Sequence, residues 1–171
     1  MSMHHCFDSG TVIADLRATD KFDALRELIR DTPVFTEIEG RDVFEQAVMA
    51  RERLHTTAFG HGVAVAHGRA PGVKRVLMAL GVSRNGIPFD APDGEPVRLL
   101  FVIASPQQVS LDYLQALSTL VRCVRHQGVR DDLLAARDAA GLEDAIHSAF
   151  SAQLEPAAAS AAGRQPCGAA G

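Results

Sequence analysis

The segment Thr57-Ala-Phe-Gly-His-Gly-Val-Ala-Val-Ala-His67-Gly68 decides the fold, because it joins a glycine-rich turn to a short strand of alternating side chains. A period of two places Val63, Val65 and His67 on one face of this strand and two alanines on the other. His67 is therefore expected at the strand end, where Gly68 leaves the approach to the ring open. A neutral imidazole keeps a lone pair near pH 7 and can attack phosphorus. A half-buried histidine that hydrogen-bonds at a strand end fits the same local pattern.

The composition is that of an ordinary globular chain, and it argues against several classes of protein. The 171 residues, 47% apolar and 22% charged, predict one domain. A net charge of -4 without a block of Lys and Arg disfavours a nucleic-acid partner, as does the presence of one Tyr and no Trp. Three cysteines without a CxxC spacing favour free thiols in a reducing compartment.

The longest uninterrupted apolar run, residues 99–104, is too short to cross a bilayer, and the N-terminus lacks the layout of a signal peptide. We therefore expect a cytoplasmic protein without membrane insertion.

Helical and strand patterns interleave along the chain, which predicts an α/β or α+β fold in which helices flank a central mixed sheet. Residues 77–80 fit a helix as well as a strand, and Gly141 is expected to separate the last two helices. We expect strands at 12–16, 63–67, 73–82 and 97–104, helices around 22–29 and at 41–54, 110–126, 131–137 and 142–154, and turns at 84–86 and 89–94. The predicted organisation is a flexible N-terminus at 1–10, one domain at 11–154 and a disordered Ala/Gly/Pro-rich tail at 155–171.

Arg51 occupies an unusual position in the helix expected at residues 41–54. The apolar stripe of this helix runs through Phe44, Ala47 and Val48, and Arg51 is the next position on it. A guanidinium on the inward face of a helix is costly unless it snorkels to solvent or meets an anion. The planar guanidinium of Arg51 matches the oxygens of a phosphate group, which it could therefore bind. The alternatives are that the side chain snorkels to solvent or pairs with a nearby carboxylate.

Three segments carry a resemblance to a known family. Residues 51–68 are similar to a block that reads Arg-Glu and then Thr-Gly-x-Gly-x-Gly-Val-Ala-x-Pro-His-Gly. Residues 88–103 are similar to the turn and core strand of that family, and Tyr113-Leu-Gln-Ala-Leu-Ser118 to its His-Leu-x-x-Leu-Ser helix. In this order and spacing, the chain resembles the type-2 enzyme IIA domains of the bacterial phosphoenolpyruvate-dependent phosphotransferase system, over roughly residues 10 to 150.

The resemblance implies a phosphoryl relay. It implies that His67 is the phosphoacceptor, that Arg51 stabilises the transferring oxygens, and that Thr57 and the amides of Gly60 and Gly62 are neutral donors. The implied donor is a histidine phosphocarrier protein of the HPr or NPr kind, docked on an apolar rim around the acceptor. The implied chemistry needs no metal, nucleotide or other cofactor, and the chain has no GxxxxGK[ST] loop.

The chain departs from the family pattern at three positions. Ala58 replaces a glycine, and Ala66 replaces the proline that precedes the acceptor. Tyr113 stands where the family carries a second active-site histidine. A phenol can donate a hydrogen bond to a phosphate oxygen, but it cannot carry positive charge. A binding module whose phosphoryl chemistry has decayed is therefore one interpretation.

Two active roles remain, and they differ in the downstream partner. A fructose- or mannitol-type transport component would pass its phosphate to a IIB protein, whereas a nitrogen-type regulator would bind a target protein according to its phosphorylation state. The Phe89-Asp-Ala-Pro-Asp-Gly94 block, together with the lack of a IIB-like Cys loop and of membrane segments, favours the nitrogen-type role.

Overall fold

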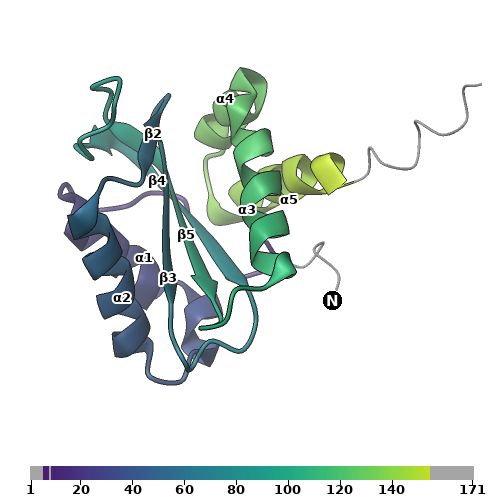
Figure 1. Cartoon of the computed structure of the whole chain (residues 1–171). Helices are drawn as coiled ribbons and strands as arrows, with labels where there is room; N and C mark the ends of the chain where they lie inside the picture. Colours follow the sequence, from purple (N-terminus) through teal and green to yellow (C-terminus); the bar gives the residue numbers. More distant parts are fainter. Residues whose placement is uncertain (1–5, 8, 155–171) are drawn as a thin grey trace, which may run out of the picture.

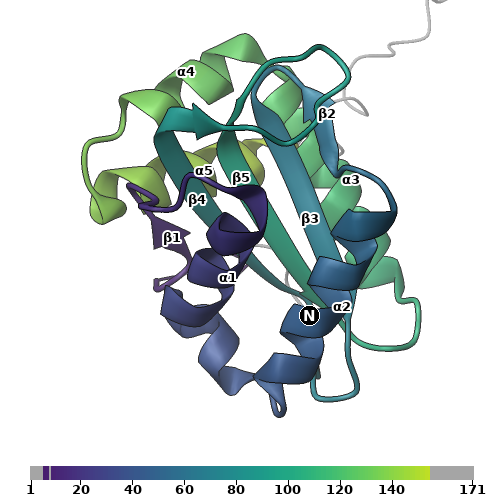
Figure 2. The same cartoon turned by 90° about the vertical axis from the view of Figure 1, so that its left-hand side faces the viewer.

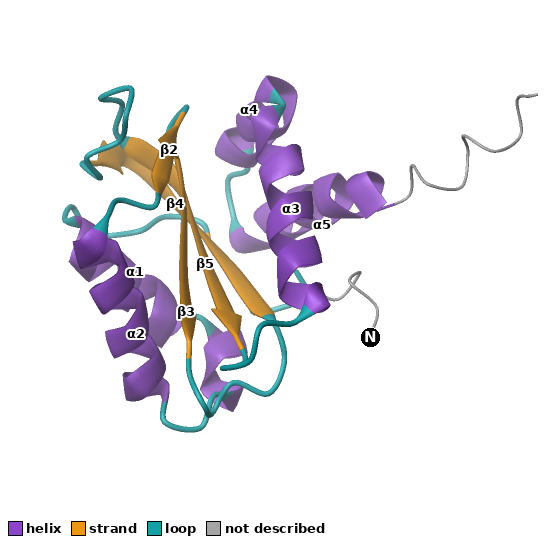
Figure 3. Ribbon diagram, in the orientation of Figure 1, coloured by secondary structure: helices purple, strands orange, loops and turns teal. Residues whose placement is uncertain are grey.

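A five-stranded mixed sheet forms the centre of the computed structural model, which describes residues 6–7 and 9–154 (Figure 3). The strands are arranged in the order β1-β4-β5-β3-β2. The pairs β1–β4 and β5–β3 are parallel, and the pairs β4–β5 and β3–β2 are antiparallel. The mixed sheet confirms the predicted fold class. The strands are β1 (Val12–Ile13), β2 (Ala58–Gly60), β3 (Val63–Arg69), β4 (Leu77–Ile87) and β5 (Val97–Ser105).

Helices cover both faces of the sheet. One face carries α1 (Lys21–Asp31), the 3-10 helix η2 (Pro33–Glu37) and α2 (Arg41–Leu54), which Figure 2 shows from the front. The other face carries α3 (Leu111–Arg125), α4 (Gln127–Ala135) and α5 (Ala139–Leu154), so that the sheet is seen on edge between the two layers in Figure 1. None of the helices within the described residues is long and apolar enough to span a membrane.

The alternation predicted for residues 63–67 is confirmed, because it divides the apolar side chains between two cores. Ala64 and Ala66 belong to the core beneath α1 and α2, whereas Val63 and Val65 belong to the core beneath α3, α4 and α5. Between β3 and β4 lies β5, which is buried along its length except at Arg98. The continuous apolar pattern of residues 97–104 thus marks the central strand, as predicted.

Several predicted boundaries are wrong for local reasons. Residues 84–86 do not form a turn, because they belong to β4, which continues to Ile87. The pairing of β4 with β5 shifts register over this stretch, between Val82 and Ile87. The strand expected at 12–16 ends at Ile13, and Gly141 lies within the first turn of α5. The short elements β2 and η2 carry no periodic signal, and the sequence did not predict them.

The N-terminal segment contributes to the core. The ring of Phe7 is 2% exposed and packs edge-on against Phe101 and Phe150, with centroid distances of 6.3 and 5.4 Å. Glu143 of α5 also accepts a hydrogen bond of 2.7 Å from the amide of Gly10. The domain limit predicted at residue 11 therefore leaves out a core side chain, and the tail predicted at 155–171 lies outside the described residues.

Candidate functional site

His67 lies on an open edge of the sheet, toward the end of β3. In register it stands opposite Ile103 of the central strand. The short strand β2 pairs with β3 only at Val63 and Ala64, so no described strand covers the outer edge of β3 at the level of His67. The imidazole faces the α3 side of the sheet and is half-buried.

Gly68 has a different role from the one predicted. A Cβ atom at this position would lie 2.7 Å from Cγ2 of Val48, 3.1 Å from its backbone nitrogen and 3.2 Å from the ring of Phe44. The residue therefore faces α2 and does not open the approach to His67. Its missing side chain lets α2 pack directly on β3. This packing brings Arg51, three residues beyond Val48 on α2, to the same sheet edge as His67.

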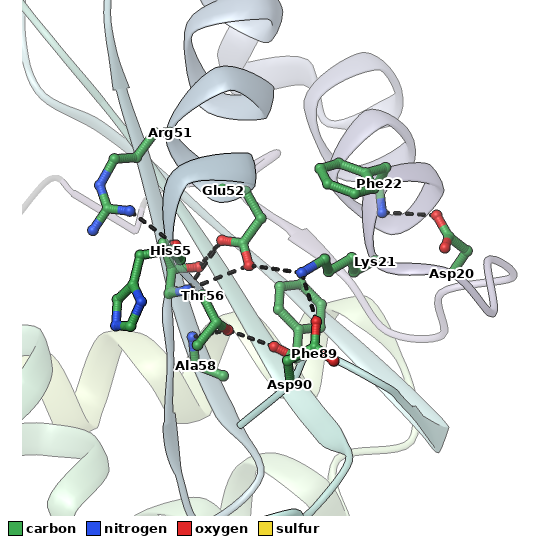
Figure 4. A network of polar contacts seen from close by, with 11 residues as sticks. Asp20, Lys21, Phe22, Arg51, Glu52, His55, Thr56, Ala58, Phe89 and Asp90 are labelled. Atoms are coloured by element: carbon green, nitrogen blue, oxygen red, sulfur yellow. Dashed lines mark hydrogen bonds and ion pairs between the residues drawn. The ribbon is translucent and has the colours of Figure 1, made fainter. Parts of the chain in front are cut away.

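Arg51 is held at the C-terminal end of α2. Its Nη1 donates a hydrogen bond of 2.9 Å to the carbonyl oxygen of His55, and Figure 4 shows the guanidinium turned away from the neighbouring side chain of Glu52. No ion pair among the described residues involves Arg51, so the pair with a carboxylate that the sequence left open is not formed. The charge nevertheless acts on His67, whose pKa it lowers.

Glu52 fixes the connection between α2 and β2. Its carboxylate is fully buried and accepts hydrogen bonds from the Thr57 amide (3.1 Å) and hydroxyl (2.6 Å). Nζ of Lys21, 3.6 Å from Glu52, also donates to Asp90 at 3.0 Å (Figure 4). Both donors of Thr57 are thus used within the fold, which contradicts the role predicted for its hydroxyl. The sequence analysis missed this function of Glu52, although the spacing of Glu52 and Thr57 on either side of a helix end was visible.

Gly60 and Gly62 lie far from His67. They flank the turn between β2 and β3, where Gly60, His61 and Gly62 have φ angles of 101°, 57° and 72°. His67 is five positions after Gly62 along an extended strand, which corresponds to about 16 Å at about 3.3 Å per residue. The prediction that these amides donate to a phosphate on His67 is therefore wrong. Glycine is needed here for the left-handed backbone of the turn.

Tyr113 lies next to His67, as the resemblance implied. The amide of Tyr113 is capped by Ser110 at the start of α3, and its ring centroid is 6.3 Å from that of His67. The guanidinium carbon of Arg69 stands 5.5 Å from the centroid of the same phenol ring. The sequence analysis missed Arg69, although the period of two that places His67 also places Arg69 on the same strand face.

Burial is the main influence on the pKa of His67, which it lowers below the ordinary value of 6.5. The Val65 carbonyl raises this pKa, Arg51 and Arg69 lower it, and Glu52 raises it. The ring is therefore neutral near pH 7. Its Nδ1 lies 3.4 Å from the Val65 carbonyl oxygen, which can only accept a hydrogen bond. This contact favours the tautomer that has its proton on Nδ1 and its lone pair on Nε2.

Cys123 and the metal-ligating side chains of the described residues do not suggest a second reactive centre. Burial raises the pKa of Cys123 to about 11, so its thiol stays protonated and weakly nucleophilic at neutral pH. Across the described residues there is no group of three or more His, Cys, Asp and Glu side chains that could hold a metal ion. The arrangement around His67 is that of a neutral nitrogen nucleophile beside two permanent cations.

Comparisons with known proteins agree with this geometry. The family model for "Phosphoenolpyruvate-dependent sugar phosphotransferase system, EIIA 2" matches residues 5–149. A nitrogen regulatory protein of Bradyrhizobium diazoefficiens is 35% identical over 148 residues, which cover 86% of this chain and 92% of the relative. A fructose-specific EIIA component of Haloferax volcanii is 36% identical over 109 residues, 64% of this chain and 71% of that one. The crystal structure of nitrogen regulatory protein IIA-Ntr from Neisseria meningitidis has a TM-score of 0.76 at 25% identity and covers 86% of this chain and 98% of its own.

Replacing Gly68 with alanine should push α2 away from β3. We expect Gly68→Ala to lower the free energy of unfolding by about 1–3 kcal/mol, because the new methyl group overlaps Val48. Urea denaturation followed by circular dichroism measures the loss. Gly128→Ala is the matched control, because a Cβ atom there meets nothing within 4 Å and should leave stability equal or higher. Equal losses in the two variants would contradict the close packing of α2 at Gly68.

The pKa of His67 should lie below 6.5 in the folded protein and rise in Arg51→Ala, which removes one of the causes that lower it. Titration of the ring by NMR measures both values, and Arg53→Ala, whose guanidinium lies over Phe22 instead, should leave the value unchanged. Because the unfolded ring takes up its proton first as the pH falls below 6.5, His67 should also lower stability on acidification. A folded pKa above 6.5 would refute this account of the site.

Proposed function

Because the chain belongs to the EIIA 2 family of the phosphoenolpyruvate-dependent sugar phosphotransferase system, we propose that His67 accepts a phosphoryl group from a histidine phosphocarrier protein of the HPr or NPr kind. The observation that carries the proposal is the neutral imidazole at an uncovered sheet edge, with Arg51 reaching the same edge from α2. A buried structural histidine would need neither the open edge nor the neighbouring cation.

The transfer exchanges one phosphorus–nitrogen bond for another. The Nε2 lone pair of His67 attacks phosphorus in line, and the bond to the donor imidazole breaks with its electron pair returning to the donor nitrogen. The proton on Nδ1 stays hydrogen-bonded to the Val65 carbonyl throughout. Charge spreads over the three equatorial oxygens in the loose transition state, and the guanidinium of Arg51 stabilises it.

Exposed apolar side chains support docking of a protein donor at this edge. Leu54, at the end of α2, is 83% exposed, and Leu111 and Leu114, on either side of Tyr113 in α3, are 75% and 50% exposed. Large apolar side chains clustered around a reactive group are typical of a protein interaction surface. Their exposure supports assigning to them the apolar rim that the resemblance implied.

The proposed role is regulatory and of the nitrogen type, in the cytoplasm. Its support is the relative from Bradyrhizobium diazoefficiens, which is named a nitrogen regulatory protein and aligns over nearly its whole length. The relative from Haloferax volcanii is named a fructose-specific component, so transfer to a IIB protein is the second candidate. Tyr113, which cannot carry positive charge, favours the third candidate, a binding module without phosphoryl transfer.

Incubation with phosphoenolpyruvate, the first enzyme of the relay and its phosphocarrier from the same organism should add one phosphoryl group to the protein. The label should be acid-labile and base-stable, as for phosphohistidine, and absent from His67→Ala; intact mass spectrometry detects it. A label that persists in His67→Ala would refute this acceptor. An unlabelled wild type would instead favour the module without transfer, and passage of the label to a IIB protein would favour the transport role.

Arg51→Ala should slow transfer from the phosphocarrier at least about tenfold, equivalent to about 1.4 kcal/mol of lost transition-state stabilisation. The guanidinium acts on His67 at the sheet edge, and no described carboxylate forms an ion pair with it. Quenched-flow measurement of labelled protein gives the rate. Arg53→Ala is the control on the same helix, because Arg53 lies over the Phe22 ring and should be dispensable. An unchanged rate in Arg51→Ala would show that Arg51 only caps α2.

A further inference from the structure

Arg69 is a second cation at the acceptor, and the fold leaves its charge unused. It lies two residues after His67 on the same face of β3, and its side chain is exposed. The guanidinium contacts the ring of Tyr113, with 5.5 Å between the guanidinium carbon and the ring centroid. Among the ion pairs of residues 6–7 and 9–154, none neutralises Arg69.

Three groups act on the imidazole of His67: the Tyr113 ring and the guanidiniums of Arg69 and Arg51. The Tyr113 ring stands 6.3 Å from the His67 ring, and Arg69 lies over the same phenol. Burial raises the pKa of Tyr113, while Arg69 and Arg51 lower it, so both guanidiniums act on the phenol as well as on His67. Arg51 arrives from α2 and Arg69 from β3, so the two cations reach the imidazole from different elements.

The carboxylate whose charge acts on His67 does not cancel these positive charges. Glu52 is the acidic group of the described residues whose charge raises the pKa of His67. It is already paired with Lys21 and hydrogen-bonded to Thr57. The imidazole is therefore neighboured by the phenol of Tyr113 and acted on by the charges of Arg51 and Arg69, an environment that favours a dianionic phosphoryl group.

We propose that Arg69, held beside the acceptor by its cation–π contact with the Tyr113 ring, is a second phosphoryl-binding guanidinium of this site. The inference rests on the proposed function and involves no further covalent step. The same phosphorus–nitrogen bond forms at His67, while Arg69 contacts the transferring oxygens. Stacking on an aromatic face leaves the in-plane N–H groups of an arginine available for such contacts. Because a guanidinium never loses its proton in this pH range, the pair supplies the permanent positive charge that Tyr113 alone lacks.

A small phosphodonor tests the proposal without the docking of a carrier protein. With phosphoramidate as donor, we expect initial rates of His67 labelling, measured by intact mass, to fall about tenfold in Arg69→Gln and less in Arg69→Lys, which keeps the charge. Arg98→Gln is the matched control, since Arg98 is also an exposed strand arginine but borders the hollow at the turn end of β3, which Gly62 and Arg130 line. It should be labelled at the wild-type rate.

A double-mutant cycle tests the part played by the ring. Tyr113→Leu removes the stacking surface and should slow labelling toward the level of Arg69→Gln, whereas combining the two changes should add little further loss. Tyr113→Phe keeps the ring, so it should retain most of the contribution of Arg69. Fully additive losses would refute the stacking arrangement. Circular dichroism confirms that each variant is folded.

The outcomes separate this inference from the proposed function. If the wild type and Arg69→Gln are labelled equally fast by phosphoramidate, Arg69 does not bind the phosphoryl group, although His67 remains the acceptor. If Arg69→Gln slows labelling only from the carrier protein, Arg69 is a docking contact and the proposal is wrong. If neither donor labels the wild type, the proposed function fails, and this inference fails with it.

Discussion

The contact between Gly68 and Val48 determines where the charged groups of the site lie. A helix packed on a sheet through ordinary side chains would stand farther from the strand, but the missing Cβ of Gly68 brings the backbone of α2 against β3. The distance matters because Arg51 follows Val48 by three residues and must pass around the sheet edge to act on His67, which faces the other layer. The missing side chain of Gly68 thus brings Arg51, which belongs to the α2 layer, close enough to act on His67, which faces the α3 layer.

Burial and charge act together on the acceptor. Desolvation and the two guanidiniums all disfavour protonation of His67, and the ring is left with a lone pair at neutral pH. The opposing carboxylate, Glu52, serves the fold instead, where Lys21 and the donors of Thr57 satisfy it. Adjacent residues on α2 therefore separate two tasks: Glu52 secures the helix end, and Arg51 leaves its charge open to an anion (Figure 4).

The sequence predicted the elements with strong periodicity and failed where contact depends on packing. The helix at 41–54 and the alternation of residues 63–67 were correct because both patterns are local. Gly60 and Gly62 were misassigned because they are near His67 along the chain, yet an extended strand carries them to the opposite end of the sheet. The contact of Gly68 with Val48 and that of Arg69 with Tyr113 join separate elements, and no single segment contains that information.

The replacement of an imidazole by a phenol changes which groups of the site can respond to pH. A second histidine would gain and lose a proton in the range where the acceptor itself titrates, so the charge around the phosphoryl group would change with the charge of the nucleophile. A guanidinium keeps its charge throughout that range, and burial raises the pKa of Tyr113, so that its phenol keeps its proton. The charge states of Arg51, Arg69 and Tyr113 beside the acceptor then stay constant. Of the four side chains, His67 is the one whose protonation changes with pH and so changes its reactivity as a nucleophile. Among these four side chains, His67 is consequently the one that contributes a pH dependence to the chemical step.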